Sequence, residues 1–385
     1  MSTVLSSSSK NIAIVINTSW NIYNFRKGLV QRLIKDGHSV FCMAPTDDFS
    51  PEFEKWGAHF VPVNNIQRKG TNPLKDLSLI FELKNLYKKH QIDIALLYTI
   101  KPNIYGILAA PKDVKTVCTV TGLGYSFIKK GWINKLVRKL YKKSFNNASQ
   151  IYFQNSDDLA LFNSLKIGNP RNMEVVPGSG INTSYFAPGE KSNNSPSHPF
   201  RFLFVGRLLN DKGIRELRQA TEILHTKNIP FSLDVVGSID RDNPAAMSGK
   251  ELEEWTQKPY IRYHGQVEDP RPFIRNCDAL VLPSYREGLP RGCLEAMSMA
   301  RPLIVTDVPG CRETVIDGKN GYLCEVQNPK DLAEKMTQLA MLPGEELKSM
   351  GAFSRQMALE KFDEQIIIQY YLDVIEKLGK RERNS

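Results

Sequence analysis

Short apolar runs alternate with amphipathic stretches in two successive series, and this alternation limits the possible folds more than any other feature of the chain. The first series begins with NIAIVIN at residues 11–17, continues with HSVFCMA at 38–44 and ends with QIYFQN at 150–155. The second begins with FRFLFVG at 200–206 and ends with PLIVTD at 302–307. Because this pattern is typical of parallel sheets covered by helices, each series predicts a doubly wound α/β domain.

The same alternation predicts further elements inside each series. They are helices at 22–36, at about 213–227 and after Pro290, and strands at 93–99, 115–121, 231–237, 261–265 and 278–284. Parallel strands joined by helices place their carboxyl ends at one edge of a sheet, where ligands bind in such folds. The loops after these strands are therefore the first places to search for a site.

The length of the chain also indicates two domains. Its 385 residues exceed the roughly 250–300 at which a single hydrophobic core usually stops growing. Residues 178–200 are rich in Gly, Pro, Ser and Asn and lack apolar periodicity, which is typical of a linker. The expected organisation is a disordered tail at 1–10, a Rossmann-like domain at 11–180, a linker at 181–200, a second Rossmann-like domain at 201–360, and at 361–385 a C-terminal helix, able to return to the first domain, with a tail.

Composition excludes several classes of protein. No apolar run has the length of a membrane span, and the start, MSTVLSSSSKN, lacks the apolar core of a signal peptide, so a cytoplasmic location is expected. The six cysteines show no C-x-x-C spacing, which favours reduced, mostly buried thiols over a zinc site or a disulfide framework.

Two loops that follow predicted strands of the second series suit an anionic ligand. FVGRLLNDKG places Arg207 and Lys212 between a strand and a helix, and LPSYREGLPRG places Glu287, Gly288 and Pro290 in the same situation. Basic side chains beside a helix N-terminus can bind a diphosphate. Because a carboxylate repels phosphate, Glu287 is expected to accept hydrogen bonds from sugar hydroxyls.

A second carboxylate follows Glu287 after a Gly-Leu-Pro turn. If the helix begins near Pro290, Glu295 lies one to two turns inside it while Glu287 stays in the preceding loop. The two carboxylates therefore do not share one helix face.

The strings FVGRLLNDKG, HGQVEDP and CDALVLPSYREGLPRGCLEAMSMARPLIVTDVPGCRETVIDGKNGYLCE together resemble the donor domain of retaining GT-B glycosyltransferases of the family-4 type, and Glu287 and Glu295 match its E-x7-E signature. YTIKPNIYGILAA and TVTGLGYSF resemble a narrower bacterial branch that extends sugars on polyprenyl-diphosphate carriers for capsule, O-antigen or glycoprotein glycan synthesis. The resemblance runs from Asn11 to about Leu378. It implies a GT-B architecture, with an N-terminal acceptor domain and a C-terminal nucleotide-sugar donor domain facing each other across a cleft.

The resemblance also implies roles for individual residues. Arg207 and Lys212 are expected to hold the donor diphosphate, and Glu287 to bind hydroxyls of the donor sugar. The other donor-binding positions that it implies are Gly206, Val267 near the base, Gly288, Leu289, Pro290 and Glu295 on the ribose. Each has a simpler alternative: a cation after a strand is often only solvated, and Glu295 can be an ordinary surface glutamate.

The acceptor-side candidates are Lys101, Thr121 and Gly122. Many relatives have a histidine where this chain has Thr121, and a threonine does not titrate near neutral pH. If the acceptor hydroxyl attacks the donor sugar on the same face from which the diphosphate leaves, the leaving diphosphate can take the proton of that hydroxyl. A transient covalent intermediate remains the alternative.

Metal and nucleic acid are not expected to bind. Asp240-Arg241-Asp242 resembles the D-x-D metal clamp of the other major glycosyltransferase fold, but it follows a strand of a nucleotide-binding type of domain. We interpret it as a loop and expect no metal and no cofactor, the nucleotide-sugar being a substrate. No aromatic and basic recognition module accompanies the net charge of +10.

Residues 129–143, KKGWINKLVRKLYKK, predict a helix with one apolar stripe and an otherwise basic surface. Two interpretations stay open: an ordinary surface helix, or an interfacial helix attracted to anionic lipid through Lys135, Arg138, Lys139 and Lys142.

The sequence thus predicts a glycosyltransferase, peripheral on the inner face of the cytoplasmic membrane. It would move a hexosyl or N-acetylhexosaminyl group from a UDP-sugar to a polyprenyl-diphosphate-linked saccharide with retention. The alternatives are an enzyme with a soluble acceptor and a non-catalytic saccharide- or nucleotide-binding protein.

Overall fold

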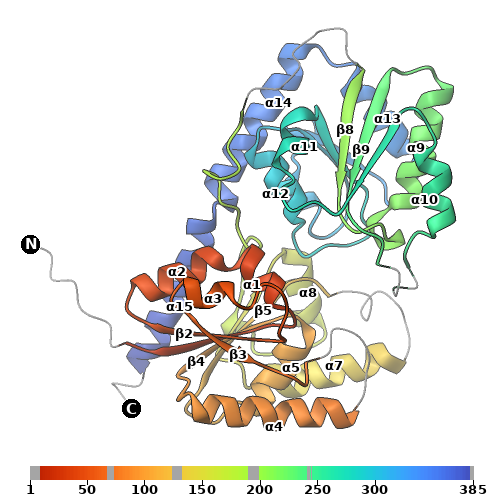
Figure 1. Ribbon diagram of the computed structural model, residues 1–385. Coiled ribbons are helices and arrows are strands. Elements are labelled where there is room, and N and C mark those ends of the chain that lie inside the picture. Colours follow the sequence, from red (N-terminus) through yellow and green to blue (C-terminus); the bar gives the residue numbers. More distant parts are fainter. Residues whose placement is uncertain are drawn as a thin grey trace, which may run out of the picture. The chain divides into compact units, whose positions relative to one another are not determined.

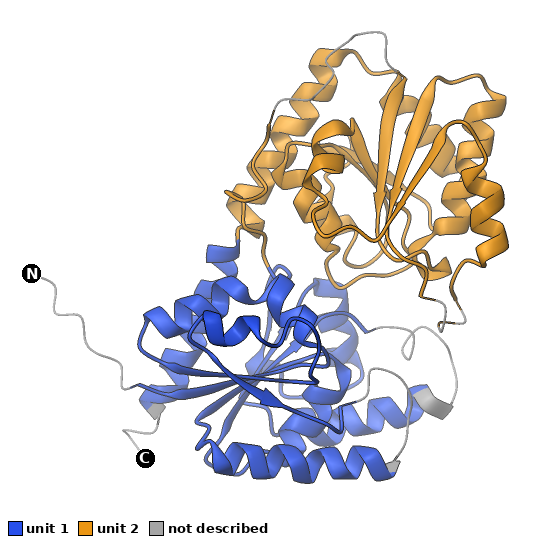
Figure 2. Cartoon of the chain, viewed as in Figure 1, with its two compact units in different colours: residues 1–179, 364–385 blue, residues 180–363 orange. Residues whose placement is uncertain are grey.

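A computed structural model describes residues 9–66, 73–123, 132–189, 199–240, 243 and 245–381. The chain divides into two compact units, shown in different colours in Figure 2. Unit 1 comprises residues 1–179 and 364–385, and unit 2 comprises residues 180–363. Each unit contains one parallel sheet with helices packed on it (Figure 1).

Unit 1 is built on a seven-stranded sheet in the order β3-β2-β1-β4-β5-β6-β7. The strands are β1 (Asn11–Val15), β2 (Ser39–Ala44), β3 (His59–Pro62), β4 (Ile94–Tyr98), β5 (Lys115–Val120), β6 (Gln150–Phe153) and β7 (Met173–Val175). All residues of the central strand β4 are buried, as expected for a parallel strand covered on both faces.

Helices cover both faces of this sheet. They are α1 (Ser19–Phe25), α2 (Lys27–Lys35), α3 (Glu52–Lys55), α4 (Pro73–Lys89), α5 (Ile100–Ala109), α7 (Trp132–Phe145), α8 (Ser156–Ser164) and α15 (Glu364–Arg381), with a 3₁₀ turn, η1 (Pro170–Asn172). Side chains of α4, α5, α7 and α8 form one core with Ala13 and Val15 of β1. Those of α2 and α15 form another with Ile12 and Ile14, because successive residues of a strand point to opposite faces.

Unit 2 is built on a six-stranded parallel sheet in the order β10-β9-β8-β11-β12-β13. The strands are β8 (Phe200–Val205), β9 (Phe231–Val236), β10 (Ile261–Gly265), β11 (Ala279–Leu282), β12 (Leu303–Thr306) and β13 (Gly321–Cys324). The helices are α9 (Ile214–Thr226), α10 (Gly249–Thr256), α11 (Arg271–Asn276), α12 (Arg291–Ser298), α13 (Pro329–Ala340) and α14 (Gly344–Met357), with the short turns η2 (Asn210–Lys212), η3 (Arg312–Thr314) and η4 (Ala358–Phe362).

The prediction of two doubly wound α/β domains is confirmed, but several local predictions differ from the structure. The helix predicted at 22–36 is two helices, because the backbone of Arg26 leaves the helical region with a φ of −131°. The linker predicted at 181–200 is partly wrong, because Ile181 and Phe186 are buried in the core of unit 2. Residues 190–198 of that linker, and 1–8 of the predicted tail, lie outside the described residues.

The C-terminal helix α15 belongs to unit 1, where Ile367, Ile368 and Tyr371 are buried in one core with residues of α2, β1 and β4. All six cysteines are buried. Among the helices of the described ranges, none combines the length and the apolarity that crossing a bilayer requires.

Candidate active site

The candidate site in unit 2 forms where two neighbouring strands end. β8 and β11 are paired in parallel, with Ala279 opposite Phe202 and Leu280 opposite Leu203. The loop that carries Arg207 and Lys212 follows β8, and the loop that carries Glu287 follows β11. The two loops therefore start from the same edge of the sheet, as the sequence predicted.

The two loops approach each other closely at Gly213, the residue that precedes α9. Its φ is 71°, and a Cβ atom at this position would lie 1.9 Å from the backbone oxygen of Pro283. Only glycine satisfies both the left-handed backbone and the close approach. The neighbouring Lys212 ends the 3₁₀ turn η2, and its Nζ forms an ion pair with Oε1 of Glu287.

This ion pair is mostly shielded from solvent. The side chains of Lys212 and Glu287 are 20% and 12% exposed. The hydroxyl of Ser284 donates a hydrogen bond of 2.8 Å to the same oxygen of Glu287. A carboxylate held by a cation and a hydroxyl has a fixed orientation, so it is preorganised to accept hydrogen bonds from a polar ligand.

The backbone of the Glu287 loop is also anchored. The Glu287 amide donates to the carbonyl of Pro309 at 3.0 Å. Gly310 has a φ of 83°, and a Cβ there would lie 2.5 Å from the backbone oxygen of Glu287 and 2.6 Å from that of Gly288. The segment after β12 thus supports the loop from behind and limits its movement.

Arg207 lies in a more open position. Its Nη1 atom is 3.3 Å from Oδ2 of Asp240, and its side chain is 45% exposed. Gly206 donates its amide to the carbonyl of Val236 at 2.9 Å, which holds the start of this loop on β9. Arg241 and Asp242 of the D-x-D-like tripeptide lie outside the described residues. Within the residues that the structure describes, no three His, Cys, Asp or Glu side chains gather as metal ligands do.

Glu295 is not a surface glutamate, so that alternative is wrong. It lies on α12 with 9% of its area exposed, and its Oε1 pairs with Nε of Arg291 at 3.1 Å. Arg291 also donates to the carbonyl of Gly180 at 2.8 Å. Burial raises the pKa of Glu295, and the charge of Arg291 opposes that rise. The carboxylate is thus held by one cation close to the start of α12.

The other predicted donor positions surround this edge of the sheet. Pro290 directly precedes α12, as predicted, and Gly288 is buried. Leu289 and Val267 are partly buried and pack against the core of unit 2, so their backbones, rather than their side chains, are the groups suited to a polar ligand.

The acceptor-side candidates belong to unit 1. Lys101 lies in the first turn of α5 and forms an ion pair of 2.8 Å with Oδ1 of Asp76 in α4. The other carboxylate oxygen of Asp76 accepts a hydrogen bond of 2.8 Å from the hydroxyl of Tyr105. Thr121 and Gly122 directly follow β5, and Gly122 has a φ of 114°.

One strained residue precedes Lys101 and was not predicted. Thr99 has a φ of 68° and a ψ of 167°, a conformation that normally only glycine adopts. Its hydroxyl oxygen is buried with no hydrogen-bond partner among the described residues. Asp76 and Ser284 were also missed. Asp76 stands in no motif, and Ser284, although it lies in the string LPSYREGLPRG, was not singled out there as a partner of Glu287.

Helix α7 corresponds to the basic segment at 129–143, and its two sides differ in exposure. Val137, Tyr141 and Phe145 are buried in unit 1, so the apolar stripe packs on its own domain as the surface-helix interpretation required. Lys135, Lys139 and Lys142 are exposed, whereas Arg138 is half-buried and is not a freely exposed basic group.

Comparisons with known proteins identify the family of the chain. Residues 199–341 match the family Glycosyl transferases group 1, and residues 11–155 match the family Glycosyl transferase 4-like. The N,N'-diacetylbacillosaminyl-diphospho-undecaprenol alpha-1,3-N-acetylgalactosaminyltransferase of Campylobacter jejuni is 30% identical over 96% of this chain and 99% of its own. The capsular polysaccharide biosynthesis glycosyltransferase CapM of Staphylococcus aureus is 26% identical over 89% of this chain and 90% of its own.

Solved structures support the fold. Sucrose-phosphate synthase from Thermosynechococcus elongatus has a TM-score of 0.80 at 18% identity, covering 97% of this chain and 100% of its own. Alr3699/HepE from Anabaena, in complex with UDP, has a TM-score of 0.76 at 16% identity, and the match covers 96% of this chain and 100% of its own. Two Rossmann-like units with this likeness, together with a relative at 30% identity over nearly the whole chain, place the chain among the GT-B glycosyltransferases, in the group 1 and 4-like family.

Proposed function

We propose that this glycosyltransferase transfers a sugar from a UDP-sugar to a polyprenyl-diphosphate-linked saccharide, with retention of anomeric configuration. The observation that carries the proposal is the shielded ion pair of Lys212 and Glu287 at the carboxyl edge of β8 and β11. One cation and one carboxylate in contact suit the two halves of a nucleotide-sugar, whose diphosphate needs positive charge and whose sugar needs acceptors for its hydroxyls.

The acceptor class rests on the relatives. The printed name of the Campylobacter jejuni relative describes a transferase acting on a diphospho-undecaprenol-linked sugar. An Escherichia coli relative, 28% identical over 66% of this chain, is named UDP-Gal:alpha-D-GlcNAc-diphosphoundecaprenol alpha-1,3-galactosyltransferase. The CapM relative supports a place in surface polysaccharide synthesis.

In the proposed mechanism, the chain provides charge and orientation rather than a strong base. Lys212 and Arg207 hold the diphosphate, and Lys212 strengthens its contact as the carbon–oxygen bond to the diphosphate breaks and negative charge grows there. Glu287 orients the sugar, and Glu295 binds the ribose hydroxyls. Because Thr121 does not titrate near neutral pH, the departing diphosphate oxygen accepts the proton of the acceptor hydroxyl as that hydroxyl attacks on the same face.

A screen of nucleotide-sugars tests the proposal directly. Purified protein is incubated with UDP-linked hexoses and N-acetylhexosamines and with a short-chain polyprenyl-diphosphate saccharide, and the product's anomeric configuration is read by NMR. Transfer only to a free saccharide would favour a soluble acceptor. Binding of UDP without transfer to any acceptor would favour a non-catalytic protein.

Activity is expected to be independent of divalent metal. Lys212 and Arg207 supply the positive charge that a metal ion provides elsewhere, so no Mg²⁺ or Mn²⁺ is needed to hold the diphosphate. Initial rates in excess EDTA should match those with added Mg²⁺ or Mn²⁺. Loss of transfer in EDTA with recovery on adding metal would contradict this, unless single-turnover rates show that the metal acts only on product release.

We also propose that the exposed lysines of α7 attract the enzyme to the inner face of the cytoplasmic membrane. Replacing Lys135, Lys139, Lys142 and Lys143, all exposed, by Gln keeps helix propensity while removing four positive charges. Binding to anionic vesicles at low salt should weaken by about 1 kcal/mol per lost charge, and by less as salt screens the rest.

A control variant that loses the same number of charges elsewhere shows whether vesicle binding depends on the position of the lysines or only on the net charge of the protein. Lys227, Lys250, Lys258 and Lys348 are exposed lysines of unit 2, and their replacement by Gln should weaken vesicle binding much less. Equal losses in the two variants would leave α7 without a special role. Unfolding of the α7 variant would show that its lysines serve packing.

A further inference from the structure

Helix α4 has two apolar faces, and its fold explains only one of them. Leu79, Leu83 and Tyr87 face inward and are fully buried in unit 1. Leu74, Leu77 and Phe81 are instead 77%, 51% and 59% exposed. Residues spaced three and four apart lie on one side of a helix, so these three side chains form a continuous stripe, which we call the α4 outer face.

The charges around the α4 outer face are positive. Lys75, Lys84, Lys88 and Lys89 are exposed on the same helix. Its two acids are engaged elsewhere: Asp76 is buried against Lys101, and Glu82 accepts hydrogen bonds of 2.8 and 2.9 Å from the backbone amides of Asn64 and Asn65. The helix therefore presents large apolar side chains bordered by basic groups.

Helix α7 extends the same character. α4 and α7 both pack against α5 and contribute to the same core, so they cover the same face of the unit 1 sheet (Figure 1). α7 exposes Leu136 at 40%, next to the exposed Lys135 and Lys139. The combination of apolar and basic side chains thus recurs on a second helix of this face.

We propose that the α4 outer face inserts into the interface of an anionic lipid bilayer, with Leu74, Leu77 and Phe81 entering the boundary between headgroups and acyl chains. An amphipathic helix with a basic border binds membranes in this way, through buried apolar area and attraction to anionic headgroups together. The lysines that border the face favour lipid over a protein partner, because the anionic headgroups of a bilayer surface are negative over its whole area and need no matching arrangement of charges.

In this arrangement α4 supplies the apolar part of membrane binding, and the lysines of α7 supply the electrostatic part. Attraction between charges is screened by salt, whereas apolar burial is not. The two contributions therefore have separate salt dependences, and this makes the inference testable without catalysis.

The test compares L77Q/F81Q with the parent and with M341Q/L359Q. Met341 and Leu359 are 72% and 45% exposed in unit 2, so the control removes similar exposed apolar surface from elsewhere. In sedimentation with phosphatidylglycerol-containing vesicles, L77Q/F81Q should bind at least about tenfold more weakly at both low and high salt. The control should bind like the parent, and the α7 lysine variant should lose binding chiefly at low salt.

A site-specific probe tests insertion itself. The six native cysteines are buried, and burial raises the pKa of Cys42 and Cys324 to about 12, so an environment-sensitive thiol dye should react selectively with an introduced surface cysteine. The dye on L77C should shift to shorter wavelength when anionic vesicles are added. The dye on M341C should not.

Three outcomes would overturn the inference: unchanged vesicle binding of L77Q/F81Q, no spectral shift at position 77, or a change in oligomeric state as the only effect of L77Q/F81Q. The last would assign the α4 outer face to a contact between protein chains. If L77Q/F81Q unfolds at the same temperature as the parent, a folding defect does not explain its weaker binding. If it unfolds at a lower temperature, the spectral shift of the dye on L77C is the deciding measurement. Transfer to a short, water-soluble acceptor tests the proposed function separately. If the parent transfers no sugar while the dye on L77C still reports insertion, the proposed function is refuted and the membrane role of α4 stands.

Discussion

Replacing Lys212 by alanine is expected to lower kcat for sugar transfer by about 100- to 1,000-fold, the usual effect of removing one preorganised group that stabilises charge in a transition state. Lys212 is shielded from solvent and held against Glu287, so water cannot take its place without loss. Arg207→Ala should have a smaller effect, about tenfold, because its side chain is 45% exposed. Steady-state kinetics with the donor identified by the screen measure both.

A double variant separates catalysis from stability. Lys212→Ala leaves the carboxylate of Glu287, which is 12% exposed, without its cation, and this can destabilise unit 2. Lys212→Ala/Glu287→Gln removes that charge, so stability should recover while kcat stays low. Turnover near the parent value in both Lys212→Ala and Arg207→Ala would refute the site.

Gly213→Ala is expected to lower the free energy of unfolding of unit 2 by more than about 3 kcal/mol, the sum of an unfavourable backbone and a steric overlap. The φ of 71° disfavours any side chain, and a Cβ would lie 1.9 Å from the Pro283 oxygen, far inside contact distance. Because the overlap separates the two loops, the contact between Lys212 and Glu287 should also weaken. Urea unfolding, followed by tryptophan fluorescence, to which the buried Trp255 of unit 2 contributes, reports the change.

Gly318→Ala is the matched control for the backbone contribution. Gly318 has a φ of 72°, nearly the value at Gly213, yet a Cβ there would meet nothing within 4 Å. Its replacement should cost only about 1 kcal/mol. Equal losses of unfolding free energy at the two positions would mean that the close approach of Gly213 to the Pro283 oxygen does not limit the residue at position 213.

The sequence predicted the central strands well because their signal is local. Strands β4 and β11 are apolar runs whose residues are all buried, and β8 is an apolar run interrupted only by Arg201; such runs predict strands of a parallel sheet by themselves. The edge strand β3 was missed, because His59–Pro62 is only four residues long and begins with a histidine and ends with a proline. Its pairing with β2 comes from the rest of the sheet, not from its own composition.

Packing of isolated apolar residues could not be predicted. Ile181 and Phe186 stand among glycines and polar residues, so no periodicity marks them, yet both are buried in unit 2. The contact of Lys212 with Glu287 joins residues that are far apart in the sequence, and only the pairing of β8 with β11 brings them together. The contact of Arg291 with Glu295 was not predicted, although a spacing of four residues places both on one side of a helix and could have indicated it.

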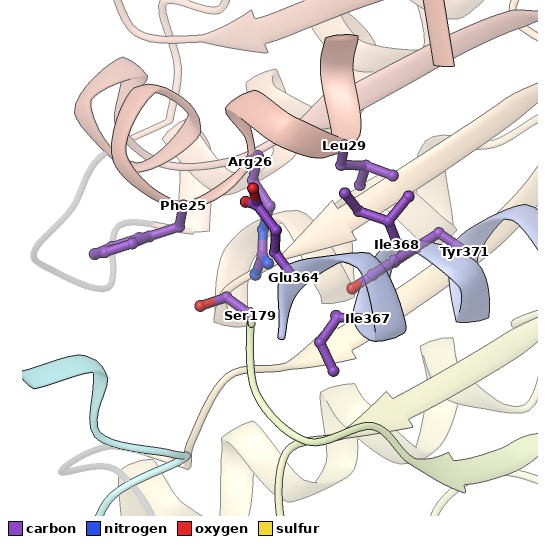
Figure 3. A pocket seen from close by; sticks show the side chains of 8 residues that line it. All are labelled: Phe25, Arg26, Leu29, Ser179, Glu364, Ile367, Ile368 and Tyr371. Atoms are coloured by element: carbon purple, nitrogen blue, oxygen red, sulfur yellow. The ribbon is translucent and has the colours of Figure 1, made fainter. Parts of the chain in front are cut away.

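Unit 1 is completed by the last part of the chain, and Figure 3 shows a small cavity at that junction, where Ile367, Ile368 and Tyr371 of α15 lie beside Arg26 and Leu29. The guanidinium of Arg26 lies 4.2 Å from the ring centre of Tyr98. A ribosome therefore delivers unit 2, residues 180–363, as one uninterrupted segment before the first 179 residues can bury the side of their sheet that α15 covers. During synthesis, Tyr98 of β4 and Tyr152 of β6, whose rings contact Tyr371, stay uncovered on that side until α15 has been made, so a chaperone has most exposed surface to protect in this interval.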